Sequence, residues 1–290
     1  MRLRTHTRSR PRSKPAGGFF FFAAVFAPCT GLLAAAAADG PAAAPGHLPP
    51  PRVQFAAAVS VDYARGLPLR GWDNTCRIIQ ATLTAWQTGT VTQAVVRNPT
   101  PDGLRQFLQN LQGPEGGIFQ VVYLAARHTP DGAWRFTRST DGSAAWSSLL
   151  RSPAPAHPGR LAILDVCHAG AVAEQPAWRA GLAPATTLLA STREELTFEF
   201  DFTNRQPIDL PARYPAALAW LRQHLPADWD GRLSNLGLTW TLAFLRTPQP
   251  PQTLQDWQAF FGRCEAEARL LQKALGPQHA STVSQSPPAP

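Results

Sequence analysis

Cysteine is scarce in this sequence of 290 residues, and its four copies, Cys29, Cys76, Cys167 and Cys264, lie far apart. No two cysteines form a C-x-x-C pair, and no two histidines show an H-x-x-x-H spacing. Zinc sites usually show one of these spacings, and small secreted domains held by disulfides contain many more cysteines. We therefore expect neither a metal site nor a disulfide framework.

Phosphate-binding loops rich in glycine are also absent. The sequence has no G-x-x-x-x-G-K-[ST], no G-x-G-x-x-G and no G-x-S-x-G. These patterns are typical of nucleotide hydrolases, dinucleotide-binding domains and α/β-hydrolases, respectively. Their absence argues against these three classes, and we expect no cofactor.

Acidic residues are missing from the first 38 positions, which hold six basic residues. The whole chain has 27 basic and 19 acidic residues, for a formal charge of +8. From Asp39 onward, 21 basic residues face 19 acidic ones, so the excess belongs to the N-terminal segment. The rest of the chain lacks the basic surplus of a nucleic-acid-binding face, and we expect no nucleic-acid partner.

The first 38 residues resemble a secretory signal peptide. The basic start leads into an apolar centre at 19–26, and the alanine run 34–38 offers an A-x-A cleavage site. We expect residues 1–38 to be removed, the protein to be exported to the periplasm or the extracellular space, and 39–52 to form a Pro/Ala linker. The alternative is a membrane anchor formed by residues 17–38, which are just long enough to span a bilayer.

Between residues 53 and 247, apolar runs alternate with helical patterns. This alternation predicts an α/β domain, a three-layer sandwich whose mostly parallel sheet has helices on both faces. The expected strands are 53–63, 91–96, 118–126, 161–166 and 187–191, with a short additional strand at 198–202. The expected helices begin near Asp73 or Asn74, at Pro101, at Pro215 and after Ser234.

The C-terminal part divides into an amphipathic helix and a tail. Residues 248–275 show helical periodicity, and we expect this helix to pack across the domain. Residues 276–290, rich in Gln, Ser and Pro, are predicted to be disordered. Cys76 and Cys264 lie on apolar helical stripes and are expected in the core.

Two expected strands end in residues that could carry chemistry. The third ends in Arg127-His128, and the fourth continues as Asp165-Val166-Cys167-His168-Ala169-Gly170. The carboxyl ends of parallel strands meet at one edge of a sheet, where reactive groups gather. A thiol at one strand end and an imidazole at the next could form a Cys/His dyad, with His128 as the base for Cys167.

The segment 165–170 resembles the D-x-C-H-[SA]-G nucleophile motif of the caspase-like cysteine peptidases, especially metacaspases and their bacterial relatives. Other segments agree in order: 67–74 resembles the turn after the first strand, 98–100 the entry to the second helix, and 188–191 the strand after the nucleophile. The resemblance covers roughly residues 53–247 and implies a caspase-like fold.

The resemblance also implies an endopeptidase that acts on proteins or peptides and cuts after Arg or Lys. Cys167 would be the nucleophile and His128 the general base. The backbone N–H groups of Cys167 and Thr129 would stabilise the oxyanion, and Asp165 would bind the basic side chain of the substrate. From the residues alone, Asp165 could equally be a hydrogen-bond anchor at the strand end.

One departure from the family pattern favours a different function. In a gapless alignment Arg127 occupies the position of the family's histidine, and His128 lies one residue later. Side chains alternate along a strand, so this shift turns the imidazole to the other face unless a bulge absorbs it. The alternative is therefore a catalytically inactive pseudo-peptidase that acts as a binding or scaffolding module.

We predict that a secreting host releases a mature protein that begins near Asp39. The basic start, the apolar centre and the small-residue site together direct cleavage after Ala38. Intact mass spectrometry of the purified protein measures this directly. Retention of residues 1–38 on a membrane-associated product would contradict cleavage and support the anchor.

Overall fold

The computed structural model describes residues 52–63, 69–86, 91–111, 119–138, 140–150, 158–205 and 208–286. The expected signal segment and nearly all of the expected linker lie outside the described residues. Within the described ranges, no helix has the length and apolar character needed to cross a membrane.

A six-stranded sheet forms the centre of the domain, in the order β10-β7-β6-β3-β1-β2. Five strands are parallel, and β10 pairs antiparallel with β7 at one edge. The strands are β1 (Val53–Val59), β2 (Val91–Arg97), β3 (Phe119–Ala126), β6 (Arg160–Val166), β7 (Thr186–Leu189) and β10 (Ser284–Ser286). The prediction of a mostly parallel α/β sandwich is confirmed.

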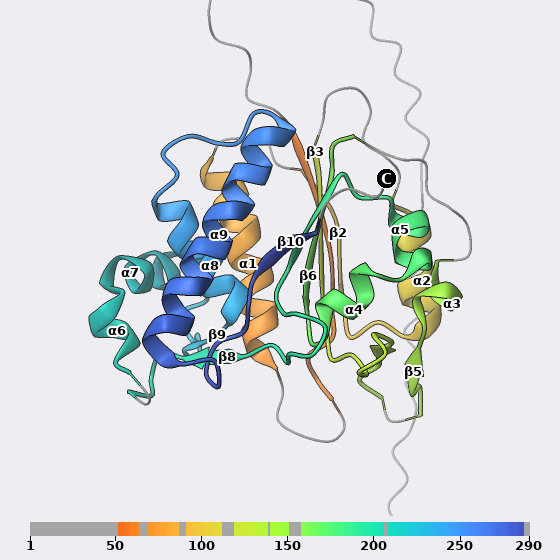
Figure 1. Ribbon diagram of the computed structural model, residues 1–290, viewed down its shortest axis with the longest axis horizontal. Coiled ribbons are helices and arrows are strands. Elements are labelled where there is room, and N and C mark those ends of the chain that lie inside the picture. Colours follow the sequence, from red (N-terminus) through yellow and green to blue (C-terminus); the bar gives the residue numbers. More distant parts are fainter. Residues whose placement is uncertain are drawn as a thin grey trace, which may run out of the picture. The chain divides into compact units, whose positions relative to one another are not determined.

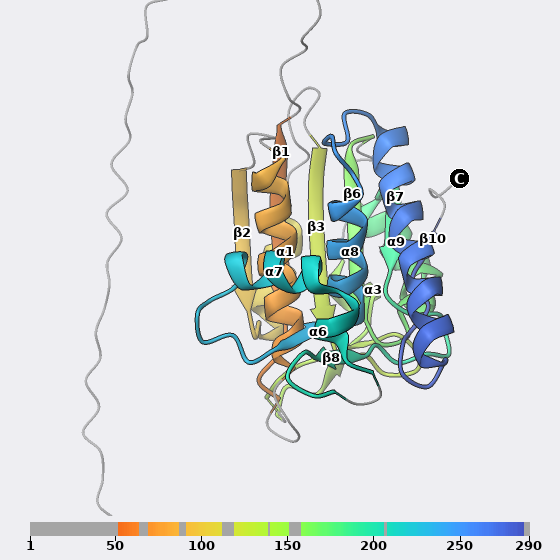
Figure 2. The same ribbon diagram turned by 90° about the vertical axis from the view of Figure 1, so that its left-hand side faces the viewer.

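Helices cover both faces of this sheet (Figure 1). One layer contains α1 (Arg70–Ala85), α7 (Pro215–His224), α8 (Asn235–Leu245) and α9 (Leu254–Leu275), which lie in front of the sheet in Figure 2. The other contains α2 (Pro101–Gln109), α3 (Trp146–Leu149), α4 (Ala169–Ala173) and α5 (Pro176–Leu182). We call these the α1 layer and the α2 layer.

The two layers have separate hydrophobic cores because side chains alternate along each strand. In β1, Phe55 and Ala57 belong to the core of the α1 layer, whereas Ala56 and Ala58 belong to that of the α2 layer. Cys76 and Cys264 are buried in the α1 layer, as predicted. The packing of α9 against α8 and the core also agrees with the expectation for this helix.

Local sequence signals set several helix boundaries. The Thr100 hydroxyl accepts the N–H of Gly103 at the start of α2, with Pro101 in the first turn. The Ser234 side chain caps α8. Thr253 and Asp256 form a reciprocal capping box at the start of α9. These helices therefore begin where their capping residues stand.

Two predicted boundaries were wrong. β1 ends at Val59, because the N–H groups of Val61 and Asp62 bond to the side chain of Asn98 instead of a neighbouring strand. α1 begins at Arg70 rather than near Asp73. The short additional strand expected at 198–202 is confirmed as β8 (Glu199–Asp201), which pairs with β9 (Arg232–Ser234) in a separate two-stranded sheet. The short elements β4 (Trp134–Arg135), β5 (Ser143–Ala144) and α6 (Leu210–Arg213) complete the described structure.

The prediction of a disordered tail was also wrong for residues 276–286. Ala280, Ser281 and Val283 are buried, and β10 adds a strand to the central sheet. Polar side chains here bond to the core domain, so the composition that suggested disorder serves docking. Residues 287–290 lie outside the described part.

Arg160 is a fully buried cation at the amino end of β6. Its guanidinium donates to the Gln120 side chain at 2.7 Å and to the carbonyl oxygens of Leu182 and Leu111 at 2.6 and 3.2 Å. Leu182 ends α5 and Leu111 follows α2, so the charge meets the negative ends of two helices. One side chain thereby holds two helices to the sheet.

We predict that Arg160→Met lowers the free energy of unfolding by at least about 2 kcal/mol, because buried carbonyl oxygens lose their donors. Urea denaturation measures the change. Arg105→Met is the control, since Arg105 pairs on the surface with the exposed Asp102 and should cost no more than about 1 kcal/mol. Equal losses in the two variants would contradict the anchoring role of Arg160.

Candidate functional site

The register between β3 and β6 determines which side chains share a face beyond the strand ends. Ala125 lies opposite Asp165, and Ala126 lies opposite Val166. Ala125 belongs to the core of the α1 layer, whereas Ala126 and Val166 belong to that of the α2 layer. Continuation of this alternation pairs the next two residues, Arg127 and Cys167, on the α1 side.

His128 lies on the opposite side, in the α2 layer. Its ring stacks on Trp146 at 6.0 Å and meets the edge of Trp134 at 5.4 Å. Nδ1 lies 3.3 Å from the carbonyl oxygen of Ala126, and Nε2 has no hydrogen-bond partner in the described structure. His128 and Cys167 both follow carboxyl ends of neighbouring strands, as predicted, but neither imidazole nitrogen bonds to the thiol.

The environment of His128 keeps its ring neutral. The side chain is 5% exposed, and burial lowers its pKa from 6.5 to about 3. A general base must reach the proton that it abstracts, directly or through one water. A buried imidazole that faces the α2 layer does not meet this requirement for Cys167.

Arg127 and Tyr63 occupy the face on which Cys167 lies. The Arg127 N–H donates to the Tyr63 hydroxyl at 2.7 Å, and its guanidinium lies over the Tyr63 ring at 4.9 Å. Burial raises the pKa of Tyr63 well above 10, with a smaller contribution in the same direction from Cys167. The loops after β1 and β3 are therefore joined beside the thiol by a neutral phenol and a guanidinium.

Cys167 is the one half-buried thiol among the described cysteines; Cys76 and Cys264 are buried. Its Sγ lies 3.6 Å from the Thr197 hydroxyl. His168 follows with a left-handed backbone at φ 58°, and its Nδ1 lies 2.8 Å from the carbonyl oxygen of Arg193. The thiol thus stands in a tight turn and has the Thr197 hydroxyl as its neighbour.

Gly170 allows this turn to pack closely. A Cβ at this position would lie 2.7 Å from the backbone nitrogen of Arg193. Any side chain would push the loop after β7 away from Cys167. The glycine that completes the sequence motif therefore has a packing role in this chain.

Thr129 does not offer a free N–H. Its backbone N–H donates to the carbonyl oxygen of Ala133 at 3.0 Å, within the turn between β3 and β4. Its hydroxyl accepts the Ala133 N–H at 3.0 Å. An oxyanion donor must point at the position of the developing charge. In this conformation the Thr129 N–H is committed to the turn.

Asp165 is completely buried and serves as a hydrogen-bond anchor. Its Oδ2 accepts from the Tyr123 hydroxyl at 2.8 Å and from the Ser234 hydroxyl at 2.5 Å. The Ser234 hydroxyl also lies 2.8 Å from that of Thr75. Burial raises the pKa of Asp165 to about 6, against the effect of these hydrogen bonds. A carboxyl group with no exposed surface does not meet a substrate side chain.

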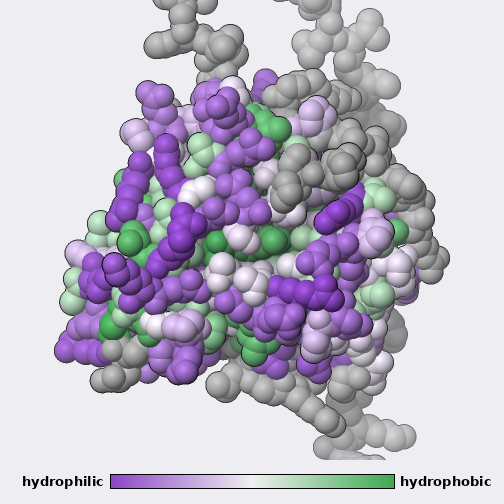
Figure 3. Space-filling view, viewed as in Figure 1, coloured by the Kyte–Doolittle hydropathy of each residue, from purple (hydrophilic) through white to green (hydrophobic). Residues whose placement is uncertain are grey.

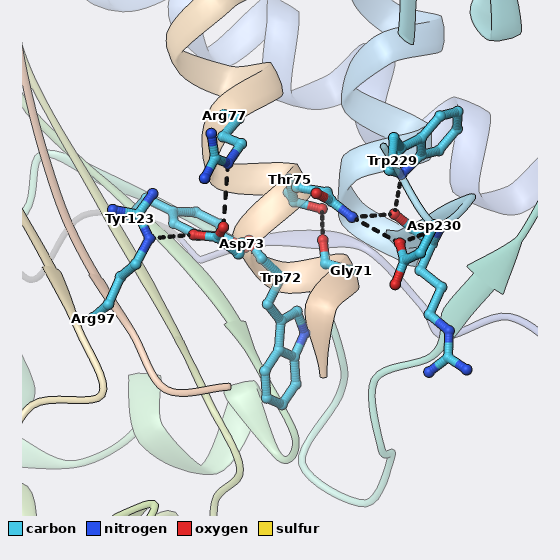
Figure 4. Close-up of polar contacts among 11 residues, drawn as sticks. Gly71, Trp72, Asp73, Thr75, Arg77, Arg97, Tyr123, Trp229 and Asp230 are labelled. Atoms are coloured by element: carbon cyan, nitrogen blue, oxygen red, sulfur yellow. Dashed lines mark hydrogen bonds and ion pairs between the residues drawn. The ribbon is translucent and has the colours of Figure 1, made fainter. Parts of the chain in front are cut away.

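The start of α1 carries a second polar cluster that sequence reasoning missed (Figure 4). Asp73 bonds to Arg77 at 3.2 Å and to Arg97 at 2.6 Å. Asn74 donates to the carbonyl oxygen of Arg232 at 2.8 Å. Only the i, i+4 spacing of Asp73 and Arg77 was visible in the sequence, because the other partners come from distant segments.

This cluster borders an open depression of about 300 Å³ beside the carboxyl ends of β1 and β2. Near the same helix start, one carboxylate oxygen of Glu199 accepts the Gly71 N–H at 2.8 Å. Burial raises the pKa of Glu199 to about 7. The carboxylate caps the start of α1, which explains why that helix begins earlier than expected.

Comparison with known proteins adds no family assignment: no family model matches the chain, and no curated protein matches it. Among the described residues, no three His, Cys, Asp or Glu side chains are grouped so that they could hold a metal ion.

We predict that His128→Phe makes stability less dependent on pH below neutrality. An imidazole with a lowered pKa is protonated in the unfolded chain first, so its contribution is present above pH 6.5 and is lost as the pH falls toward 3. Between pH 7 and pH 4.5, wild type should lose about 2–3 kcal/mol relative to the variant.

Urea denaturation at a series of pH values measures this difference. His279→Phe is the control at an exposed position. Asp165 and Glu199 remain in all three proteins, so their opposite dependence on pH cancels in the comparison. Parallel curves for wild type and His128→Phe would contradict the buried neutral imidazole.

Proposed function

We propose that this chain is an exported, caspase-like pseudo-peptidase, a binding or scaffolding module with protein or peptide partners. The caspase-like assignment rests on the segment 165–170 and on the order of the other matching segments. The mostly parallel sheet agrees with it, because Cys167 follows the carboxyl end of a central strand. Export rests on the resemblance of residues 1–38 to a signal peptide.

The orientation of His128 is the observation that favours a binding module over an enzyme. Its imidazole is packed between Trp134 and Trp146 in the α2 layer, while Cys167 shares its face with Arg127. A guanidinium cannot take the thiol proton, because arginine stays protonated in proteins. The residue at the position of the family's base is therefore unable to do the base's work.

Two further residues support this proposal. Asp165 uses its carboxylate inside the domain, where Tyr123 and Ser234 bond to it, so it leaves no acidic pocket for Arg or Lys. The N–H of Thr129 bonds to Ala133. The residues expected to act as base, substrate pocket and oxyanion donor thus all make contacts within the fold.

We infer that a partner would contact the loop beside the thiol. Leu196 is 56% exposed, and its neighbour Thr197 contacts Cys167. In the space-filling view, hydrophilic residues predominate and hydrophobic ones form small separate patches (Figure 3).

Endopeptidase activity after Arg or Lys is the second candidate. The intact nucleophile motif and the half-buried Cys167 favour it. It would require the turn at 127–133 to rearrange so that His128 leaves the tryptophans and faces the thiol. Binding of a substrate would have to supply the free energy of that rearrangement.

We predict no Cys167-dependent cleavage of fluorogenic peptides that end in Arg or Lys. The assay compares wild type with Cys167→Ala at equal concentrations. We also expect His128→Ala to leave the rate of Cys167 alkylation by iodoacetamide within about twofold of wild type, because the ring makes no contact with the sulfur. Peptide mapping by mass spectrometry reports alkylation at Cys167 separately from the other cysteines.

Arg127→His is the matched variant, since it places an imidazole on the face of Cys167. It should change the alkylation rate and its pH profile where His128→Ala does not. Turnover that disappears in both Cys167→Ala and His128→Ala would overturn the pseudo-peptidase and establish the dyad.

A further inference from the structure

The segment 277–286, which we call the strap, returns from the end of α9 to the edge of the central sheet (Figure 1). Its last three residues form β10, where Ser284 lies opposite Leu189 and Ser286 lies opposite Thr187. Residues 277–279 are exposed. The strap is thus an edge element attached to the domain through a short strand and a set of side-chain contacts.

Ser281 fixes the middle of the strap. Its hydroxyl donates to the carbonyl oxygen of Ala190 at 2.7 Å, directly after β7. Its own carbonyl oxygen accepts from the Asn235 side chain at 3.1 Å, at the start of α8. Ser281 is completely buried, so these bonds lie away from water and depend on correct docking.

Thr282 contacts the loop that surrounds Cys167. Its N–H donates to one carboxylate oxygen of Glu195 at 3.0 Å, and its hydroxyl donates to the other at 2.9 Å. Glu195 also accepts the N–H of Thr192 at 3.1 Å. Two bonds from Thr282 therefore join the strap to the Glu195 carboxylate, and the bond from Thr192 holds that carboxylate within its own loop. A hydrogen bond to a charged carboxylate is stronger than one between two neutral groups.

Glu195 continues the connection to the thiol. Its carbonyl oxygen accepts the N–H of His168 at 2.9 Å, the residue directly after Cys167. Two residues further along the loop, the Thr197 hydroxyl lies 3.6 Å from the Cys167 sulfur. The position of the loop 191–198 relative to Cys167 thus depends on a residue that the strap holds.

We propose that the strap is a conformational switch for the Cys167 site: docked, it holds the loop 191–198 against the thiol, and undocked, it releases the loop and exposes Cys167. A three-residue edge strand with half-buried side chains is among the elements that open locally before a domain unfolds. The switch changes the exposure of the thiol, so the proposal does not depend on whether the protein is a pseudo-peptidase or an enzyme.

Full-length variants test the proposal through two measurements that need no turnover. Hydrogen exchange reports opening of residues 191–198, and iodoacetamide labelling with peptide mapping reports exposure of Cys167. Glu195→Gln and Thr282→Val weaken the contact while nearly preserving shape, and we expect each to speed labelling of Cys167 at least about fivefold. Removal of residues 277–290 should produce a larger increase.

Two controls isolate the contact. Thr282→Ser keeps the hydroxyl and should stay close to wild type. Ser286→Ala alters the strap at a side chain for which the described structure has no hydrogen bond, and it should change neither measurement.

Unchanged exchange in 191–198 and unchanged labelling in Glu195→Gln and Thr282→Val would overturn the switch. An equal rise of exchange in α1 (70–85) would overturn it as well, because the strap would then support the whole domain. If the truncated chain fails to fold, the variants Glu195→Gln and Thr282→Val still test the switch. Peptidase turnover in wild type would contradict the proposed function and leave this result intact.

Discussion

The buried carboxyl group of Asp165 organises the carboxyl edge of this domain. It lies at the end of β6, accepts from Tyr123 of β3 and from Ser234 at the start of α8, and through Ser234 it reaches Thr75 of α1. A buried acidic group is tolerated only when hydrogen bonds compensate the loss of water. The two strands, α1 and α8 must therefore keep one arrangement, and the loops that carry Arg127 and Cys167 depend on this arrangement.

Strand alternation is the second constraint, and it acts on the chemistry. After β3, a histidine at position 127 would face the thiol, whereas a histidine at position 128 packs in the opposite core. The α2 layer receives His128 as an aromatic packing residue beside Trp134 and Trp146, and the α1 side receives Arg127, which Tyr63 holds. The same histidine thus changes from a candidate base into part of a hydrophobic core.

Local patterns predicted the elements well because periodicity and caps are encoded in neighbouring residues. The start of α7 and the start of α2 follow from Pro215 and Thr100, whereas α9 begins at Leu254, six residues after the predicted segment begins. The alternation argument also identified Arg127 as the residue to examine. The role of Asp165 stayed open, since its partner Ser234 lies 69 residues away. The docked strap was missed for a similar reason: composition describes a segment, whereas docking depends on the surface that the segment meets.

The anchor at the opposite edge of the sheet differs in kind. Among the described residues, Arg160 bonds to the amide oxygen of Gln120 and to two backbone carbonyl oxygens, and none of these partners titrates. His128, Asp165 and Glu199, which burial makes sensitive to pH, lie at the carboxyl edge. A change of pH therefore acts mainly on buried groups at the carboxyl edge of the sheet. The amino edge depends on Arg160, a cation that stays protonated in proteins, whereas the groups with strongly shifted pKa values lie at the edge where Cys167 stands.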